Sequence, residues 1–299
     1  MGSRAHVLVL GHGADAMVDV ARARLDELER RWSRFLPDSE ISRVNAAAPA
    51  PVIVSPETCA LIVVALRGWR LTDGLFDPTV LGDVIRAGYD RPFVMIPSGA
   101  RAGSSERRSG CAGIVVDEHT RTARLPEHVG FDPGGIGKGL AADLVVDDLV
   151  RRGAEGACVN VGADVRVAGR GPSDSWKVDV LDPLDEHPVD VLSVAQGAVA
   201  TSSRATRQWT VDGRRAHHLI DPATGRPAAT GLVAVTALAG TGARAEVLAK
   251  AAFVAGRERG AAWLEEHEVP ALLVDDRGEW TTTSAWYRFR ATRLEDVLR

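Results

Sequence analysis

A stretch near the start of the chain places apolar residues at alternating spacings of four and three, with Arg and Glu residues between them. On a helix of about 3.6 residues per turn, positions with this spacing share one face. The pattern predicts an amphipathic helix whose apolar face packs into a core. The residues on that face are Ala14, Val18, Ala21, Leu25, Leu28, Trp32 and Phe35.

Three more helices are indicated by their end signals. Ser55 and Pro56 place an N-cap residue before a proline at the first helical position, and Gly74 ends the apolar segment that follows. The other two helices are expected over residues 137–152 and 244–266. Internal glycines in the second of these segments suggest a break within it.

Short apolar runs separated by turn residues predict strands. Most of these runs follow one another directly, and the helices are grouped instead of alternating with them. This order favours an α+β fold with mixed or antiparallel sheets and flanking helices over a doubly wound parallel sheet. We expect a single domain over residues 1–299. The predicted strands span residues 6–10, 113–117, 122–125, 157–161, 165–168, 176–181, 189–195 and 232–239.

Residues 97–110 contain mainly Ser, Gly, Ala and Arg and few large apolar side chains. This composition predicts a mobile surface loop. We interpret its arginines, Arg101, Arg107 and Arg108, as solvated charges rather than as an anion site.

Composition and charge exclude several classes of partner. The 299 residues are 45% hydrophobic and 25% charged, an ordinary globular balance, and a net charge of -4 gives no general attraction to nucleic acid. No segment approaches the ~18 consecutive apolar residues of a membrane span. Cys59, Cys111 and Cys158 form no CxxC pair, which argues against zinc or disulfide frameworks and favours a cytoplasmic protein.

Two turns are rich in residues that suit phosphate or metal chemistry. Residues 72–79, TDGLFDPT, leave a helix, and an Asx-type turn is their simplest interpretation. Residues 131–143, FDPGGIGKGLAAD, place glycine N–H groups at the start of a helix, where the helix dipole favours a pyrophosphate. The segment is neither a Walker A loop nor a GxGxxG motif, and a tight helix start accounts for it equally well.

Two further segments carry titratable side chains. His217 and His218 are adjacent on a β-like step, so they point to opposite faces and are poor ligands for one metal ion. A neutral imidazole here is a candidate general base near pH 7, although a histidine in such a place is as often structural. Glu246 and Lys250 have the helical spacing of an ordinary surface ion pair.

Taken together and in this order, these segments resemble the FAD:protein FMN transferase (ApbE) family over nearly the whole chain. No single segment is decisive, but their joint occurrence at these separations is specific. The matching segments are Met1-Gly2-Ser3, Trp32-Ser33-Arg34-Phe35, residues 37–42, Asp73-Gly74-Leu75-Phe76-Asp77, residues 134–143, residues 159–164, residues 200–203 and residues 218–225.

The resemblance implies transfer of FMN from FAD to a serine or threonine hydroxyl of an acceptor flavoprotein, with release of AMP and assistance from Mg²⁺. It also implies an acceptor motif of the type Asp-x-x-Ser/Thr-Ala/Gly-Thr. In the family pattern His218 stands at the catalytic base, whereas Gly135, through its carbonyl group, and Glu246 stand at the metal. The positions that match FAD contacts are Met1, Phe35, Leu75, Phe76, Asp77, Asp132, Lys138 and Leu219.

The match departs from the family pattern around the metal. Lys250 replaces the usual threonine ligand, and Lys138 stands where some relatives carry glutamate. Unit charges about 4 Å apart at a dielectric of ~20 interact by ~4 kcal/mol, so a lysine would repel Mg²⁺ by roughly twice that. We expect Lys250, with Lys138, to neutralise part of the pyrophosphate charge and to weaken the need for metal. Ala163 replaces a glycine and is expected to keep a negative φ.

Two alternatives stay open on these residues. A Mg-dependent FAD pyrophosphatase would use the same scaffold with water as the nucleophile, because the nucleophile leaves no residue signature. A non-catalytic flavin-binding protein would keep the pocket and lose the metal, and Lys250 is the residue that favours this alternative.

Overall fold

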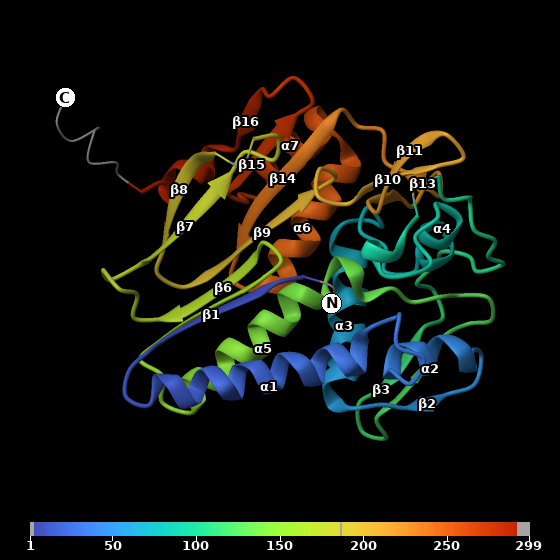
Figure 1. Ribbon diagram of the computed structural model, residues 1–299, viewed down its shortest axis with the longest axis horizontal. Helices are drawn as coiled ribbons and strands as arrows, with labels where there is room; N and C mark the ends of the chain where they lie inside the picture. Colours follow the sequence, from blue (N-terminus) through green and yellow to red (C-terminus); the bar gives the residue numbers. More distant parts are fainter. Residues whose placement is uncertain (1–2, 98, 186, 292–299) are drawn as a thin grey trace.

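The computed structural model describes residues 3–97, 99–185 and 187–291. The largest sheet among these residues has seven strands, and each pair of neighbouring strands is antiparallel. The predicted α+β fold is therefore confirmed. In spatial order the strands are β1 (Ala5–Leu10), β5 (Gly156–Val161), β6 (Asp164–Gly169), β9 (Gly197–Ser203), β14 (Leu232–Ala239), β15 (Ala271–Asp275) and β16 (Trp280–Thr282) (Figure 1).

Helices cover one face of this sheet. α5 (Gly137–Arg151) and α6 (Gly242–Ala255) lie directly on it, α1 (Ala14–Trp32) packs along α5 and β1, and α7 (Arg257–Glu266) packs on α6 (Figure 1). The predicted break in the last helical segment falls at Gly256, which has φ 86° and separates α6 from α7. The two helices then pack so closely that a side chain at Gly260 would overlap the carbonyl oxygen of Ala252.

A two-stranded ribbon covers the opposite face of the sheet. Its strands are β7 (Trp176–Leu181) and β8 (Pro188–Val194), and their apolar side chains form one cluster with residues of β6, β9, β14 and β15. β14 is thereby enclosed by the ribbon on one face and by α6 on the other. This double burial explains its sequence, LVAVTALA, in which every residue but the last is buried.

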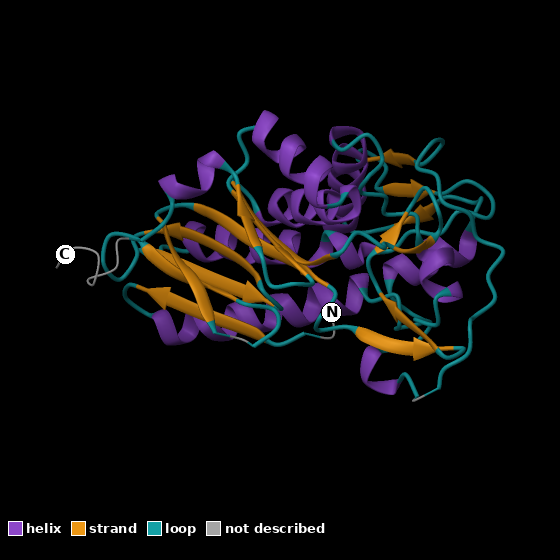
Figure 2. Cartoon of the chain, turned by 90° about the horizontal axis from the view of Figure 1, so that it is seen from above, coloured by secondary structure: helices purple, strands orange, loops and turns teal. Residues whose placement is uncertain are grey.

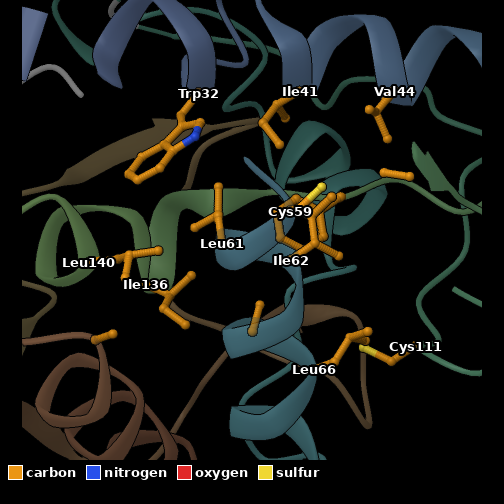
Figure 3. Close-up of a cluster of buried hydrophobic side chains, with 14 of the residues drawn as sticks. Trp32, Ile41, Val44, Cys59, Leu61, Ile62, Leu66, Cys111, Ile136 and Leu140 are labelled. Atoms are coloured by element: carbon orange, nitrogen blue, oxygen red, sulfur yellow. The ribbon is translucent and has the colours of Figure 1, made fainter. Parts of the chain in front are cut away.

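A second cluster of apolar side chains surrounds α3 (Pro56–Leu71). Ser55 caps this helix by accepting a hydrogen bond from the Thr58 amide, and Pro56 lies in its first turn, as predicted. α2 (Glu40–Ala47) packs against the same cluster. The cluster links α3 to α1, α2 and the start of α5 through Trp32, Ile41, Val44, Leu61, Ile62, Ile136 and Leu140 (Figure 3).

Small elements complete the molecule beside α3, and their strands lie across the helices from the large sheet (Figure 2). A three-stranded sheet contains β2 (Val52–Ile53), β4 (Thr122–Arg124) and β3 (Val115–Asp117). Two hairpins pair β10 (Gln208–Val211) with β11 (Arg214–His217) and β12 (Ile220–Asp221) with β13 (Arg226–Pro227). Three helical turns are α4 (Leu81–Arg86), η1 (Phe93–Met95) and η2 (Pro133–Gly135), whereas η3 (Ser284–Arg288) packs against β15 at the large sheet.

The prediction omits several short elements, among them α2, α4, β10, β11 and β16, and it differs from the structure in three further respects. α1 ends at Trp32 and does not reach Phe35, because Ser33 adopts an extended conformation with φ -66° and ψ 115°. The prediction omits β9, whose sequence GAVATSS lacks large side chains because Ala198 and Ala200 pack directly against Ala245 of α6. It also omits β15, a short and fully buried strand.

The loop over residues 97 and 99–110 forms only isolated bridges, at Ala100 and Arg108. The interpretation of Arg107 as a solvated charge is wrong, because its guanidinium group donates to the carbonyl oxygens of Val129 and Asn45 at 3.2 and 3.0 Å. Burial lowers the pKa of Arg107. The mobility of this loop and the single domain over residues 1–299 stay predictions.

Candidate active site

A pocket lies where α1 ends, beside η2 and α6. Aromatic side chains and a few charged groups line it together, as is usual for small-molecule sites. Its wall combines parts of residues 32–35, 76–80 and 132–138 with Arg207, His218 and Lys250. The fold therefore brings segments from most of the chain to one place.

Most of the side chains selected from the sequence line this pocket or lie next to it. Leu75 and Leu219 do not line it, because they pack into the apolar clusters behind its wall. Met1 lies outside the described residues. The predicted residues on the pocket wall are Phe35, Phe76, Asp77, Asp132, Gly135, Lys138, His218 and Lys250.

The glycine-rich turn uses part of its own hydrogen-bonding capacity. Asp132 caps η2 by accepting a hydrogen bond from the Gly134 amide at 2.9 Å. The Gly139 amide, in the first turn of α5, donates to Glu246 Oε2 at 2.9 Å. The turn therefore offers a ligand fewer free amides than its sequence suggests, although Gly135 and Gly137 still line the pocket.

Lys138 lies between two buried carboxylates. Its Nζ atom pairs with Asp164 and, at 2.6 Å, with Glu246 Oε1. Burial opposes the charged form of Lys138, but the two carboxylates outweigh it and raise the pKa of this lysine. Burial also raises the pKa of Asp164, to about 7, against the effect of Lys138. Lys138 thus neutralises acids of the protein itself.

The predicted surface ion pair between Glu246 and Lys250 is wrong. Glu246 is 3% exposed and faces α5, whereas Lys250 faces the pocket. Lys250 Nζ lies so close to Gly135 that a side chain at that position would overlap it. Burial lowers the pKa of Lys250, although Glu246 favours its charged form. The prediction failed because α6 is buried on nearly all sides, so its polar residues face protein rather than solvent.

His217 and His218 point in opposite directions, as predicted. His217 packs edge-on against Phe253, with ring centroids 6.0 Å apart, away from the pocket. His218 lines the pocket, and its Nδ1 atom is buried with no hydrogen-bond partner in the described part of the chain. Burial and then the positive charge of Lys250 lower the pKa of His218 well below its usual value. The His218 imidazole is therefore neutral near pH 7, as a proton acceptor must be.

Arg34 is a pocket residue to which the sequence analysis assigns no role. Its guanidinium group stacks on the rings of Phe35 and Tyr89, 4.1 and 4.6 Å from their centroids, and donates to the Tyr89 carbonyl oxygen at 2.8 Å. Its Nε atom lies 3.6 Å from Asp132 Oδ2. The residue belongs to the matching segment that begins at Trp32, and that position was the signal available for it.

Asp77 holds a turn, as its Asx-type interpretation predicts. Its Oδ1 atom accepts hydrogen bonds from the Thr79 amide at 2.7 Å and from Cys111 Sγ at 3.5 Å. Burial raises the pKa of the Cys111 thiol, so this cysteine is a poor nucleophile. Asp77 therefore shapes the pocket wall through the turn that it stabilises.

Comparison with known proteins identifies the family. The ApbE family model matches residues 1–273. A FAD:protein FMN transferase of Vibrio cholerae is 31% identical over 257 residues, which cover 84% of this chain and 76% of that protein. The chain belongs to the ApbE family. A FAD:protein FMN transferase of Treponema pallidum is 32% identical over 274 residues, which cover 84% of this chain and 74% of that protein.

Solved ApbE structures share the fold. The ApbE protein of Thermotoga maritima superposes with a TM-score of 0.84 at 27% identity, over 96% of this chain and 94% of that chain. The flavin transferase ApbE of Vibrio cholerae superposes with a TM-score of 0.80 at 26% identity, over 97% and 96% of the two chains. The ApbE membership expected from the sequence is confirmed.

One turn departs from the conformation expected for Ala163. Ala163 has φ 75°, so the expectation of a negative φ is wrong. Its amide donates to Asn160 Oδ1 at 3.0 Å, and Gly162 before it also has a positive φ of 60°. The Asn160 bond and the β5–β6 hairpin therefore hold an alanine in a conformation that favours glycine.

The residues do not fit the magnesium site that the ApbE resemblance implies. Both carboxylate oxygens of Glu246 are already bonded, one to Lys138 and one to the Gly139 amide. Lys250 adds an ammonium group beside Gly135. The described residues contain no group of three or more His, Cys, Asp or Glu side chains arranged to hold a metal ion. Protein sites usually hold Mg²⁺ through one or two free carboxylates, whereas here the Glu246 carboxylate is occupied and an ammonium group lies beside Gly135.

No described helix combines the length and the apolar composition that crossing a membrane requires.

Proposed function

We propose that this chain is a FAD:protein FMN transferase, which moves FMN from FAD to a serine or threonine hydroxyl of an acceptor protein and releases AMP. The observation that supports this proposal most directly is the convergence of His218, Lys250 and the turn at residues 134–137 on one pocket in an ApbE chain. The relatives that bear this enzyme name match most of the chain, which supports the assignment to the transferases.

In the proposed reaction, the acceptor hydroxyl oxygen forms a bond to the phosphorus atom on the FMN side of the FAD diphosphate. The bond from that phosphorus to the bridging oxygen breaks, and AMP leaves with this oxygen. The hydroxyl proton passes to the neutral imidazole of His218. Lys250, Arg34 and the amides of the glycine turn stabilise the negative charge of the diphosphate during the transfer.

The test is direct labelling of an acceptor. The protein is incubated with FAD and an acceptor that carries the Asp-x-x-Ser/Thr-Ala/Gly-Thr motif, and flavin fluorescence of the denatured acceptor is read in a gel. AMP is measured by chromatography in the same samples. We expect one AMP per labelled acceptor, and an acceptor whose motif hydroxyl is removed stays unlabelled. An acceptor that remains unlabelled although FAD binds would contradict the proposal.

Hydrolysis of FAD to FMN and AMP is the second candidate, because water can replace the acceptor hydroxyl in the same pocket. AMP release at the same rate with and without acceptor would favour this pyrophosphatase. The unpaired Nδ1 atom of His218 favours a third candidate, a flavin-binding protein without catalysis, because no residue in the described part of the chain bonds to Nδ1 and orients the imidazole as a base. FAD retention without AMP release would support it.

The proposed partner is an acceptor flavoprotein. The proposed location of this chain is the cytoplasm. Both parts depend on the family resemblance and the cysteine pattern rather than on the pocket itself.

A further inference from the structure

Lys250 differs from the neighbouring Lys138 because no described residue forms a hydrogen bond or ion pair with it. Lys138 shares its Nζ atom between Asp164 and Glu246. Within residues 3–97, 99–185 and 187–291, Lys250 Nζ forms no hydrogen bond or ion pair, and nearby carboxylates act on it only over a longer distance. An ammonium group that is withdrawn from water without a partner is costly. An anion that enters the pocket would therefore gain a charge-assisted hydrogen bond there.

The surroundings of Lys250 suit a phosphate group. Its Nζ atom lies against Gly135, in the turn that leads into α5, and a Cβ atom built at Gly135 would also lie 3.0 Å from Phe76. The first residues of α5, Gly137 and Lys138, line the same pocket. The N-terminal end of a helix adds a favourable dipole for an anion at this place. The free ammonium group, the glycine turn and the helix end thus face one volume.

Glu246 does not compete for this position. Its two carboxylate oxygens bind Lys138 Nζ at 2.6 Å and the Gly139 amide at 2.9 Å, so it neutralises one lysine and caps α5. A divalent cation at Gly135 would meet the ammonium groups of both lysines. A single ammonium group from the protein fits where a metal ion does not.

We propose that the Lys250 ammonium group takes the place of the divalent cation in this chain and binds an oxygen atom of the FAD diphosphate directly. This inference rests on the proposed function for the identity of the dinucleotide. It predicts that FAD binds in the absence of metal and that Lys250 supplies the charge that magnesium would otherwise supply.

The test measures FAD affinity by quenching of flavin fluorescence, in excess EDTA and in Mg²⁺. Wild type should bind FAD with the same affinity in both, within about twofold. Lys250→Met should weaken FAD binding by about 10- to 100-fold in both conditions, the range for one hydrogen bond to a charged group. Riboflavin, which has no phosphate, should bind wild type and Lys250→Met alike. Lys177→Met is the matched control, because Lys177 is exposed on β7 and donates to Ser193 Oγ.

Two wild-type results would overturn the inference even if Lys250→Met failed to fold. The first is loss of FAD binding in EDTA. The second comes from electron paramagnetic resonance of Mn²⁺, whose free-ion spectrum should not change when wild type and FAD are added, so a bound-ion spectrum would contradict the inference. Unchanged FAD binding by Lys250→Met that still binds riboflavin would overturn it as well.

The same experiments separate this inference from the proposed function. An acceptor that stays unlabelled while FAD binds in EDTA contradicts the transferase activity and leaves the role of Lys250 intact. Labelling that proceeds in Mg²⁺ but stops in EDTA supports the transferase activity and contradicts the role of Lys250.

Discussion

His217 and His218 are adjacent, yet their surroundings give them different chemistry. His217 Nδ1 accepts a hydrogen bond from the Leu219 amide at 3.3 Å, and its Nε2 atom lies 3.2 Å from the Ala228 carbonyl oxygen. A neutral ring with its proton on Nε2 satisfies both partners, whereas a second proton on Nδ1 would face an N–H group. Burial accordingly lowers the pKa of His217 to about 4.

The pKa of His217 predicts an acid-sensitive fold. Between about pH 6.5 and pH 4 the unfolded chain binds a proton at His217 that the folded chain does not, so stability is complete above this window and falls with pH inside it. The loss reaches about 3 kcal/mol at the lower end. His217→Gln keeps an amide donor for Ala228 and should lose less. Urea unfolding of both proteins at about pH 7.5 and pH 4.5 measures the difference, and equal losses would exclude His217 as the cause.

His218 carries the prediction for activity. His218→Ala should lower the rate of FMN transfer by about 10²- to 10⁴-fold, because the acceptor hydroxyl loses its proton acceptor. FAD affinity should change little, since the diphosphate is held by other groups. Initial transfer rates and a fluorescence titration with FAD measure the two effects, and His217→Gln serves as the control outside the pocket. A His218→Ala protein that transfers FMN at the wild-type rate would remove this residue from the mechanism.

At the scale of elements, α5 and α6 cap each other. Asp143 of α5 accepts hydrogen bonds from the Gly242 and Ala243 amides at the start of α6, at 2.6 and 3.0 Å. Glu246 of α6 accepts the Gly139 amide at the start of α5. Burial raises the pKa of Asp143 to about 6, against the effect of these amides. The carboxylates thus satisfy helix N–H groups, and this exchange fixes how the two helices cross beneath the pocket.

This crossing needs glycine on both helices. A Cβ atom at Gly139 would overlap the carbonyl group of Gly242, and one at Gly242 would overlap that of Gly139. Gly139→Ala should therefore destabilise the protein by about 1–3 kcal/mol, with a loss of roughly 2–4 °C in Tm per kcal/mol. Gly240→Ala is the matched control, because among the described residues no atom outside its chain neighbours lies within 4 Å of its Cβ position. Thermal unfolding followed by circular dichroism should show no comparable loss for the control.

At the scale of the whole molecule, elements that are distant in the sequence meet at the pocket. Its wall runs from Trp32 at the end of α1 to Lys250 in α6, and the cluster around α3 connects the same helices behind it. A ligand in the pocket therefore contacts elements from both ends of the chain. Ligand binding should therefore stabilise the whole fold and not only the elements on one side of the pocket.

This arrangement predicts a thermal shift with FAD. At about 100 times its dissociation constant, FAD should add about 2.7 kcal/mol to stability and raise Tm by roughly 5–10 °C. AMP and riboflavin, each of which is only part of FAD, should give smaller shifts at the same concentration. Differential scanning calorimetry provides the measurement. An equal shift with riboflavin would mean that the diphosphate contributes nothing to binding.

Local patterns along the chain predict the elements well. The apolar spacing of α1, the Ser55–Pro56 start of α3 and the apolar run of β14 depend on neighbours within a few residues, so they are visible without the fold. β9 was not predicted in this way, because its small residues are explained only by the helix that packs on them. The combination of motifs also indicates the ApbE family, because the motifs lie far apart in the chain and occur in a definite order.

The roles of the charged residues depend instead on contacts between distant segments. The spacing of Glu246 and Lys250 describes a helix in solvent, but α6 is enclosed by α5, the sheet and the pocket, so one residue caps a helix and the other faces the ligand space. Likewise, the sequence around Lys138 gives no sign of an ion-pair partner, whereas in the structure Asp164 and Glu246 both pair with it. Burial and neighbouring charges set the protonation of each group, and the partners of Lys138 lie 26 and 108 positions away in the chain.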